Sequence, residues 1–332
     1  MKYISKTLSA VFVLVCLSVQ VSHAHNQVFI VASSSVREFA QHVALEFAKE
    51  TVYPSPAIRT ADSRESINNL VSNDESINAD IILASRNLHS SVTAKANEDR
   101  DIIELPIGLD GILFVNDSNG SDFQLTREDI FLALAKDVPV NGKLIPNPYK
   151  TWRQIRSSLP DKKILVFGPV SGSGSRDAID KEMIANFAAR FPEYRDYCGP
   201  YQEIRNDGCY VGFVDEGQQF VDRLVKNSEA VGIVPYWCYM KNSSRIKYAS
   251  VDGVDPSYEK IAKREYPFSR ELFLYVRSSD VYGCYPLRDY IDLFLSEEMI
   301  GDFGQLHDIG LVTLLHRERL DTRRYWLKTS RE

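Results

Sequence analysis

The chain has 332 residues, of which 44% are hydrophobic and 25% charged, and its formal net charge is −6 at pH 7. This length allows two α/β domains of ordinary size, and the composition is that of a folded globular protein. The acidic balance argues against nucleic acid as a partner, because such surfaces need an excess of Lys and Arg. A small anion can still be bound, since a buried site depends on local dipoles.

The N-terminus is predicted to be a secretory signal peptide over residues 1–24. Lys2 and Lys6 precede an apolar run at 8–21, and small residues follow, so cleavage is expected after Ala24. The apolar run falls short of the ~20 residues that a membrane span needs. The sequence therefore predicts an exported, soluble protein.

The cysteines that follow the signal peptide are predicted to form disulfides. They are Cys198, Cys209, Cys238 and Cys284. An even number in an oxidising compartment favours disulfides over reactive thiols. Cys198 and Cys209 bracket a loop with glycine and proline and are the expected pair, which leaves Cys238 for Cys284. Metal binding is disfavoured because no pair has CxxC spacing.

The first strand and helix are predicted next along the chain. Residues 27–32 (QVFIVA) are strand-like, and Ser33, Ser34 and Ser35 follow them. Apolar residues over 36–48 then recur at i, i+3 and i+4, which is typical of one face of a helix. The serines therefore stand where a strand is followed by a helix.

Similar patterns recur along the chain. A strand at 57–60 precedes a polar turn with Ser63 and an amphipathic helix, and a strand at 79–84 ends in Ser85 and Arg86. A strand at 163–167 precedes the loop 168–174 and a helix whose apolar positions lie at 178–187. This alternation predicts an α/β fold with largely parallel sheets.

Further elements are predicted in the second half of the chain. Thr126 and Asp129 have the spacing of a capping box at the start of a helix. The other predicted elements are a short helix after the turn at 147–152, a helix at 216–226, a strand at 230–234 and an amphipathic helix at 287–299.

The serine turns suggest an oxyanion site. The first turn of a helix leaves backbone N–H groups unpaired and has a positive dipole end, so it attracts anions. The alternative is that Ser34, Ser63 and Ser173 are ordinary N-caps, a common role of serine before a helix.

The loop at 172–176 favours the anion site. Gly172 and Gly174 allow close approach on both sides of Ser173. Arg176 adds a planar group with five donors, which suits a tetrahedral oxyanion. A flexible linker would gain nothing from that arginine.

Motifs of catalysis do not match this loop. It has no lysine for a Walker loop, no glycine at position 177 for a dinucleotide fingerprint, and no GxSxG for a nucleophile elbow. The histidines of the mature chain form no recognisable triad pattern. An enzyme is therefore the weaker interpretation.

The sequence resembles the exported phosphate-binding proteins of ABC-type phosphate importers, the PstS-like family. The strongest match is NPYKTWRQIRSSLPDKKILVFGPVSGSGSRDAI at 147–179, against a loop of the SGT-R-D-A type. Further matches are SSSV at 33–36, ADIILASRNL at 79–88 and FVDRLVKNSEAVGIVPY at 220–236. They follow the family order over nearly all of the mature chain, and their combination is specific although no single motif is.

The resemblance implies a type II periplasmic-binding-protein fold. Each of its two α/β lobes has a mostly parallel sheet flanked by helices, and the ligand is clamped between the lobes. Strands that cross between the lobes are expected near 105–114 and 268–275. The first lobe would comprise 25–108 plus 271–332, and the second lobe 109–270.

The resemblance also implies the ligand contacts. Carried over position by position, they are Ser35 with Ser34 as a close alternative, the amide of Val36, Ser63, Ser85, Arg86, Ser173, Gly174, Ser175 and Arg176. The alternative for Arg86 is a surface or interlobe ion pair.

Three positions depart from the usual family pattern. Pro169 stands where some members have an arginine, and Arg86 where some have the aspartate that accepts the proton of hydrogenphosphate. The run at 215–218 is Asp-Glu-Gly-Gln, where the family has a Gly-Glu-Asn-Asp-like run. The proton acceptor is therefore open among Asp110, Asp177 and Asp207.

The expected function is that of a periplasmic receptor that binds inorganic phosphate and delivers it to an ABC-type permease in the membrane. It is expected to be a monomer without cofactor, metal or covalent chemistry. The alternatives are a receptor for sulfate or molybdate, a secreted phosphatase-like hydrolase, and a sensor or adhesion protein that binds no ligand.

Overall fold

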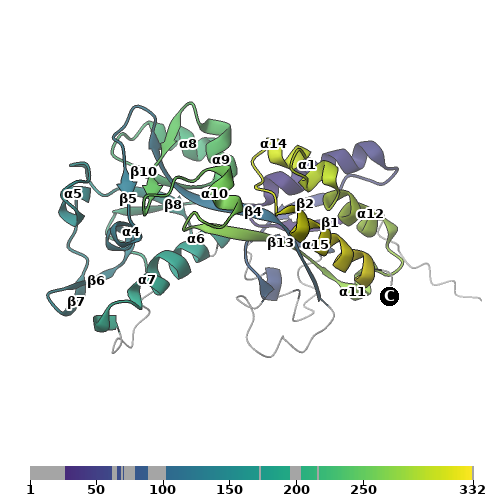
Figure 1. Ribbon diagram of the computed structural model, residues 1–332, viewed down its shortest axis with the longest axis horizontal. Coiled ribbons are helices and arrows are strands. Elements are labelled where there is room, and N and C mark those ends of the chain that lie inside the picture. Colours follow the sequence, from purple (N-terminus) through teal and green to yellow (C-terminus); the bar gives the residue numbers. More distant parts are fainter. Residues whose placement is uncertain are drawn as a thin grey trace, which may run out of the picture.

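Two long strands join two lobes in the computed structural model, which describes residues 27–61, 66–68, 70, 79–88, 102–171, 173–194, 203–214 and 217–330. The strands are β4 (Ile102–Asp117) and β13 (Ser269–Arg277), and Figure 1 shows them crossing between the lobes. They pair antiparallel from Ile102 opposite Arg277 to Gly111 opposite Ser269. Both lie where crossing strands were predicted. The predicted signal peptide is outside the described residues.

The first lobe contains a sheet of three parallel strands that β13 extends. Its strands are β1 (Phe29–Ala32), β2 (Ala57–Thr60) and β3 (Ile81–Ala84). β1 lies between β2 and β3, and β3 pairs antiparallel with β13. All three strands were predicted, with ends that differ by up to two residues.

Both faces of the strands β1 and β3 are buried. Ile30 and Leu83 belong to the main hydrophobic core, whereas Val31 and Ile82 belong to a second cluster with Phe273. Alternate residues of a strand point to opposite faces, so a parallel sheet buried on both faces has nearly continuous apolar strands. This explains why QVFIVA and ADIILA predicted strands.

Two helices cover one face of the first lobe. The predicted helix α1 (Arg37–Glu50) buries Phe39, Ala40, Val43, Ala44 and Phe47. It packs against α12 (Tyr285–Phe294), where the rings of Phe47 and Tyr290 lie 5.6 Å apart in an edge-on arrangement. The apolar stripe of α1 therefore lies against the core, as its spacing predicts.

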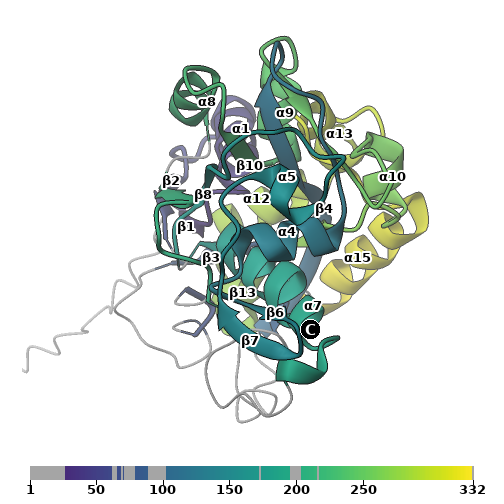
Figure 2. The ribbon, with the colours of Figure 1, turned by 90° about the vertical axis from the view of Figure 1, so that its left-hand side faces the viewer.

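The second lobe contains β8 (Val166–Pro169), β9 (Tyr210–Phe213) and β10 (Val231–Pro235). Starting from β4, the strand order is β10, β8 and β9. β10 is antiparallel to β4 and parallel to β8, and β8 is parallel to β9. β11 (Ile246–Tyr248) pairs with the end of β4. The lobes therefore share β4, and Figure 2 shows this strand passing through the middle of the molecule.

The helices of the second lobe largely follow the sequence prediction. α4 (Arg127–Leu134) begins with a capping box, in which Thr126 Oγ1 accepts from Asp129 N at 3.0 Å and Asp129 Oδ2 from Thr126 N at 2.8 Å. α8 (Gln218–Val225) lies within the predicted range. The helix predicted after β8 consists of α6 (Gly174–Ala178), π-helical turns over Ile179–Ala185, and α7 (Asn186–Ala188).

The remaining elements are short, with one exception. They are β5 (Gln124–Leu125), β6 (Asp137–Val140), β7 (Lys143–Pro146), α5 (Trp152–Ile155), a 3-10 turn (Pro192–Tyr194), α9 (Tyr236–Asn242), β12 (Ser250–Val251), α10 (Tyr258–Ala262), α11 (Ser278–Val281), α13 (Glu297–Ile300), α14 (Gln305–Asp308) and the longer α15 (His316–Thr329). None of the described helices is both long and apolar enough to cross a bilayer.

The predicted helix at 287–299 is divided into α12 and α13. α12 ends at Phe294, and Ser296 is the N-cap of α13, where its Oγ accepts from Met299 N at 3.2 Å. A serine that satisfies a backbone N–H in this way favours a new helix start over continuation.

The predicted disulfide between Cys238 and Cys284 is wrong. Cys284 is a free thiol at the start of α12 in the first lobe, whereas Cys238 is buried in α9, which packs on β4 and β10. Cys238 and Cys284, which were paired by elimination, therefore lie in different parts of the fold. Cys209 is also a free thiol. Its expected partner Cys198 lies outside the described residues.

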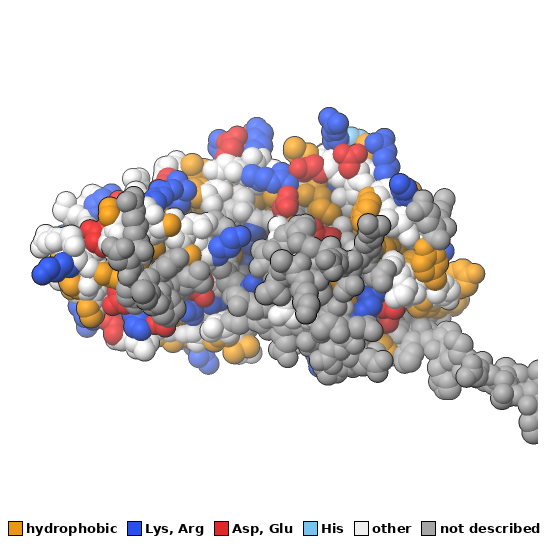
Figure 3. All heavy atoms as spheres, turned by 90° about the horizontal axis from the view of Figure 1, so that it is seen from below, with side chains coloured by type: hydrophobic (Ala, Val, Ile, Leu, Met, Phe, Trp, Pro, Cys, Tyr) orange, Lys and Arg blue, Asp and Glu red, His pale blue; other side chains and the backbone are white. Residues whose placement is uncertain are grey.

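The described surface carries charges of both signs. On the face seen in Figure 3, Lys and Arg side chains are interspersed with Asp and Glu over both lobes. The described part of this face therefore has no extended basic stripe of the kind that nucleic acid requires.

Candidate functional site

Two of the predicted loops of the first lobe lie side by side. β1 and β3 are parallel neighbours, so the loops that follow them leave the same edge of the sheet. Ser33 N donates to Leu83 O at 2.9 Å, which ties the first loop to the end of β3. The residues 33–36 and 85–86 are therefore held together, as binding residues commonly are at the carboxyl ends of parallel strands.

The serine turn after β1 is compact and largely buried. Ser35 is fully buried, Ser34 is half-buried, and the hydroxyl oxygens of Ser33 and Ser35 lie 3.2 Å apart. Val36 N donates to Ser33 O at 3.1 Å, so the turn itself uses this predicted ligand donor. Val36, and not Ser34, is the N-cap residue of α1, and it makes no side-chain cap. The ordinary N-cap interpretation of Ser34 is therefore wrong.

The loop after β3 is supported from the crossing strands. The hydroxyl oxygen of Tyr275 lies 2.6 Å from Arg86 O and 3.0 Å from Glu104 Oε2. Glu104 Oε2 also accepts from Leu88 N at 2.7 Å. Burial raises the pKa of the Tyr275 hydroxyl, which therefore stays protonated. These contacts fix the backbone at Arg86 and just after it.

Ser173 caps the helix of the second lobe. Its Oγ accepts from Arg176 N at 3.1 Å and donates to Val170 O at 3.1 Å. The ordinary N-cap interpretation therefore holds for Ser173.

Arg176 is fixed beside this loop by two contacts. Its Nε donates to Asp180 Oδ1 at 2.8 Å, and its guanidinium lies 5.1 Å from the ring centroid of Tyr210. The Tyr210 hydroxyl in turn donates to Pro169 O at 2.7 Å. The guanidinium is thus held in one orientation, although part of its charge is balanced by Asp180.

Residues of both lobes meet at Arg270, on β13. Nη1 of Arg270 donates to Ser85 Oγ at 3.2 Å, and Nη2 donates to Ser175 Oγ at 3.1 Å. Ser85 follows β3 in the first lobe, and Ser175 belongs to α6 in the second. The structure therefore joins two of the predicted ligand residues through a residue that was not predicted.

Asp110, on β4, anchors this arginine. Its Oδ2 accepts from Arg270 Nη2 at 2.7 Å and from Nε at 3.1 Å, and its Oδ1 accepts from Tyr236 N at 3.0 Å. Burial raises the pKa of Asp110, and Arg270 and the amides of Tyr236 and Gly111 oppose that rise. Both oxygens are engaged, so Asp110 does not offer an open acceptor for a ligand proton.

The other two candidates for the proton acceptor have different positions. Asp207 accepts from Arg205 Nη2 at 2.6 Å and from Lys150 Nζ at 2.5 Å. Its pKa lies well below the usual range, chiefly because of the hydrogen bond from Arg205. The side chain of Asp177 lies outside the described residues, as does Ser63.

Arg270 had a signal in the sequence. It stands in the polar triplet Ser-Arg-Glu of the predicted crossing strand at 268–275, and Asp110 interrupts the apolar run at 105–114. Ionised side chains in buried strands are rarely found unpaired. The sequence does not show that the two strands are antiparallel neighbours. Arg270 and Asp110 are recognised as partners only from this pairing, in which they lie opposite each other.

The arrangement suits an anion. Several serine hydroxyls belong to these loops and strands, as do the guanidinium groups of Arg86, Arg176 and Arg270. Donors in fixed positions recognise oxyanions through charge-assisted hydrogen bonds. In the described ranges, no three His, Cys, Asp or Glu residues gather as metal ligands do.

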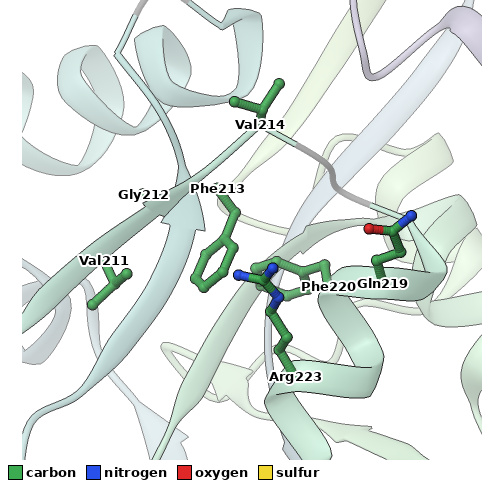
Figure 4. Close-up of a pocket in the computed structure, with 7 residues that line it drawn as sticks. All are labelled: Val211, Gly212, Phe213, Val214, Gln219, Phe220 and Arg223. Atoms are coloured by element: carbon green, nitrogen blue, oxygen red, sulfur yellow. The ribbon is translucent and has the colours of Figure 1, made fainter.

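A pocket of about 420 Å³ lies elsewhere, beside the outer strand β9 (Figure 4). Phe213 from this strand and Phe220 and Arg223 from α8 line it, and the Arg223 guanidinium lies 5.3 Å from the ring centroid of Phe213. None of the predicted ligand residues lines this pocket.

Comparison with known proteins identifies the class. Residues 19–298 match the model of the PBP superfamily domain, and the chain therefore belongs to this superfamily. A structure of a putative phosphate ABC transporter substrate-binding protein with bound phosphate from Clostridium perfringens superposes with a TM-score of 0.61 at 20% identity, over 86% of this chain and 98% of that one. This likeness in fold agrees with the predicted two-lobed α/β architecture.

Two curated relatives add similarity in sequence. The chain is 25% identical over 209 residues to the phosphate-binding protein PstS of Staphylococcus haemolyticus, which covers 60% of this chain and 56% of that protein. It is 25% identical over 225 residues to protein SphX of Synechocystis, which covers 65% of this chain and 60% of that protein. The chain thus spans less than two thirds of the length of these relatives.

Proposed function

We propose that this protein is an exported receptor that binds inorganic phosphate between its two lobes and delivers it to an ABC-type permease. The observation that carries the proposal is the meeting of Ser85 and Ser175, one from each lobe, at the buried guanidinium of Arg270. A phosphate that accepts from both serines stabilises the closed arrangement of the lobes, because it binds that arrangement better than an open one.

The proposed ligand set keeps the loops predicted from the sequence. Ser35 and Ser85 with Arg86 supply the first lobe, and Ser175 with Arg176 the second. Ser63 remains part of the proposal, as does the loop at Gly174. Ser173 and the amide of Val36 support these loops, because both are engaged in local hydrogen bonds.

The lobes are proposed to comprise residues 25–108 with 271–332, and residues 109–270. The protein is proposed to act outside the cytoplasm, in the periplasm, as a monomer. It is proposed to catalyse no reaction, because the loops supply hydrogen-bond donors that suit the binding of an oxyanion. The names of the relatives agree with a phosphate ligand.

Calorimetric titration tests this function. Phosphate, sulfate and molybdate are titrated separately into protein from which bound phosphate has been stripped. We expect saturable heat with phosphate at one site per chain, and weaker or no heat with sulfate and molybdate. Protein that binds sulfate or molybdate more tightly would be a receptor for another oxyanion, and absence of heat with all three would refute the receptor.

A second assay separates the receptor from a hydrolase. Release of p-nitrophenol from p-nitrophenyl phosphate is followed with the same protein, and no turnover is expected. Turnover that Ser173→Ala abolishes would replace the receptor by a phosphatase-like enzyme.

A further inference from the structure

We propose that Arg270 is a positioning residue of the oxyanion site, which orients one serine hydroxyl from each lobe toward the ligand. This inference rests on the proposed function. It assigns a role to a crossing strand, whereas the predicted ligand residues all lie in loops and at helix starts.

The donors and acceptors that arginine and serine possess determine the direction in which the two hydroxyl groups donate. A guanidinium has five donors and no acceptor, and a serine hydroxyl has one proton and two lone pairs. Arg270 therefore donates to Ser85 at 3.2 Å and to Ser175 at 3.1 Å, and each hydroxyl can send its own proton only away from the arginine. A ligand oxygen between the two loops therefore meets hydroxyl groups whose lone pairs are turned toward Arg270.

Asp110 holds the guanidinium in the required orientation. Arg270 and Asp110 are direct partners on the antiparallel strands β13 and β4, and their side chains are 9% and 2% exposed. Two hydrogen bonds from Arg270 occupy Oδ2 of Asp110, which leaves the remaining donors of the fork for the serines. The pair supplies donors without adding net charge, so the charge that attracts the ligand comes from the other arginines.

The role extends across the lobes. Arg270 stands on a strand shared by both lobes, and its two serine partners belong to different ones. Both hydroxyls can be oriented together only while the lobes keep this relative position. Arg270 thus links the orientation of the serine hydroxyls to the relative position of the two lobes.

A double-mutant cycle on phosphate affinity tests this role. Ser85→Ala is measured in the wild-type protein and in Arg270→Met/Asp110→Asn, which removes both charges and leaves no unpaired buried carboxylate. We expect the background variant to bind phosphate about 10-fold or more weakly. Ser85→Ala should then weaken binding about 3- to 10-fold in the wild-type protein and less than about 2-fold in the background variant.

The matched control is Arg277→Met on the same strand. Arg277 donates to Leu70 O and lies beside Asp280, so its contacts in the described part of the chain are with neighbours other than the two serines. In the Arg277→Met background, Ser85→Ala should weaken phosphate binding as much as it does in the wild-type protein. Equal losses in all three backgrounds would overturn the positioning role.

A conservative variant separates positioning from mere charge. Arg270→Lys keeps the charge beside Asp110, but one ammonium cannot reproduce the fixed fork that reaches two serines. We expect it to bind phosphate nearly as weakly as the charge-free variant, and wild-type affinity in Arg270→Lys would refute the role. Wild-type protein that binds no oxyanion would refute the proposed function together with this inference, whereas additive losses would refute the inference alone.

Discussion

Two arginines of the candidate site, Arg176 and Arg270, differ in how their charge is balanced. Arg270 is paired with the fully engaged carboxylate of Asp110. Arg176 makes one hydrogen bond to Asp180, whose side chain is 24% exposed, and stacks on Tyr210. A partly exposed partner balances a charge less completely, because water screens it. Arg176 therefore retains more attraction for an anion than Arg270 does.

Replacing Arg176 tests this assignment. We expect Arg176→Ala to weaken phosphate binding by more than about 10-fold, because a hydrogen bond to a charged group contributes about 1.5–3 kcal/mol. Asp180→Ala is the matched control, since it removes the competing carboxylate and should leave affinity equal or higher. Calorimetry measures both. Near-normal affinity in Arg176→Ala would mean that the arginine serves only the helix and Tyr210.

The sequence predicted serines of the site but not Arg270, which joins two of them in the structure. Ser35, Ser85 and Ser175 were expected from the family resemblance, whereas the local pattern of a polar turn between a strand and a helix pointed only to the loops. Arg270 is brought to Ser85 and Ser175 by the pairing of strands that are about 160 residues apart. Local patterns carry no information about such a register, which is also why elimination wrongly paired Cys238 with Cys284.

Among the elements, α9 has an unusually close neighbour in the C-terminal segment. Gly310, after α14, has a φ of +100°. A Cβ at this position would lie 2.6 Å from Trp237 Cα in α9. Only glycine fits there, both because of the backbone angle and because of the space.

Substituting this glycine should destabilise the fold. We expect Gly310→Ala to lower the free energy of unfolding by about 2–5 kcal/mol, since strain at positive φ adds to a backbone clash. Gly253→Ala is the control, because Gly253 has a φ of +78° but no atom lies within 4 Å of the added methyl group. This substitution should lower the free energy of unfolding by only about 1–2 kcal/mol. Urea unfolding measures both, and equal losses would show that α9 moves aside without cost.

Elements with an apolar period were predicted well, and those without it were not. α1 and the strands β1 and β3 have continuous or periodic apolar residues. α15 was missed because its buried residues are Arg319, Thr322 and Trp326, two of them polar. Arg319 is buried because it donates to Asp302 at 2.8 Å and to Leu314 O at 2.7 Å. Such a polar buried face has no hydrophobic stripe to detect.

For the whole molecule, the two-lobed architecture follows from the way the strands are shared. β4 pairs with β13 over its first part and with β10 and β11 over its second. The strands join the lobes directly, so relative motion of the lobes changes the distance between the loops at 33–36 and 85–86 and the loop at 173–176. A ligand between these loops therefore reports the position of both lobes.

Hydrogen exchange followed by mass spectrometry tests the central claim, that both lobes hold one phosphate. Phosphate-stripped protein is compared with and without saturating phosphate, and the hairpin β6–β7 serves as an internal reference away from these loops. We predict slower exchange in peptides covering 33–37 and 85–88 of the first lobe and 173–178 of the second, with no change in the hairpin. Protection confined to one lobe, or to the pocket beside β9, would contradict the account.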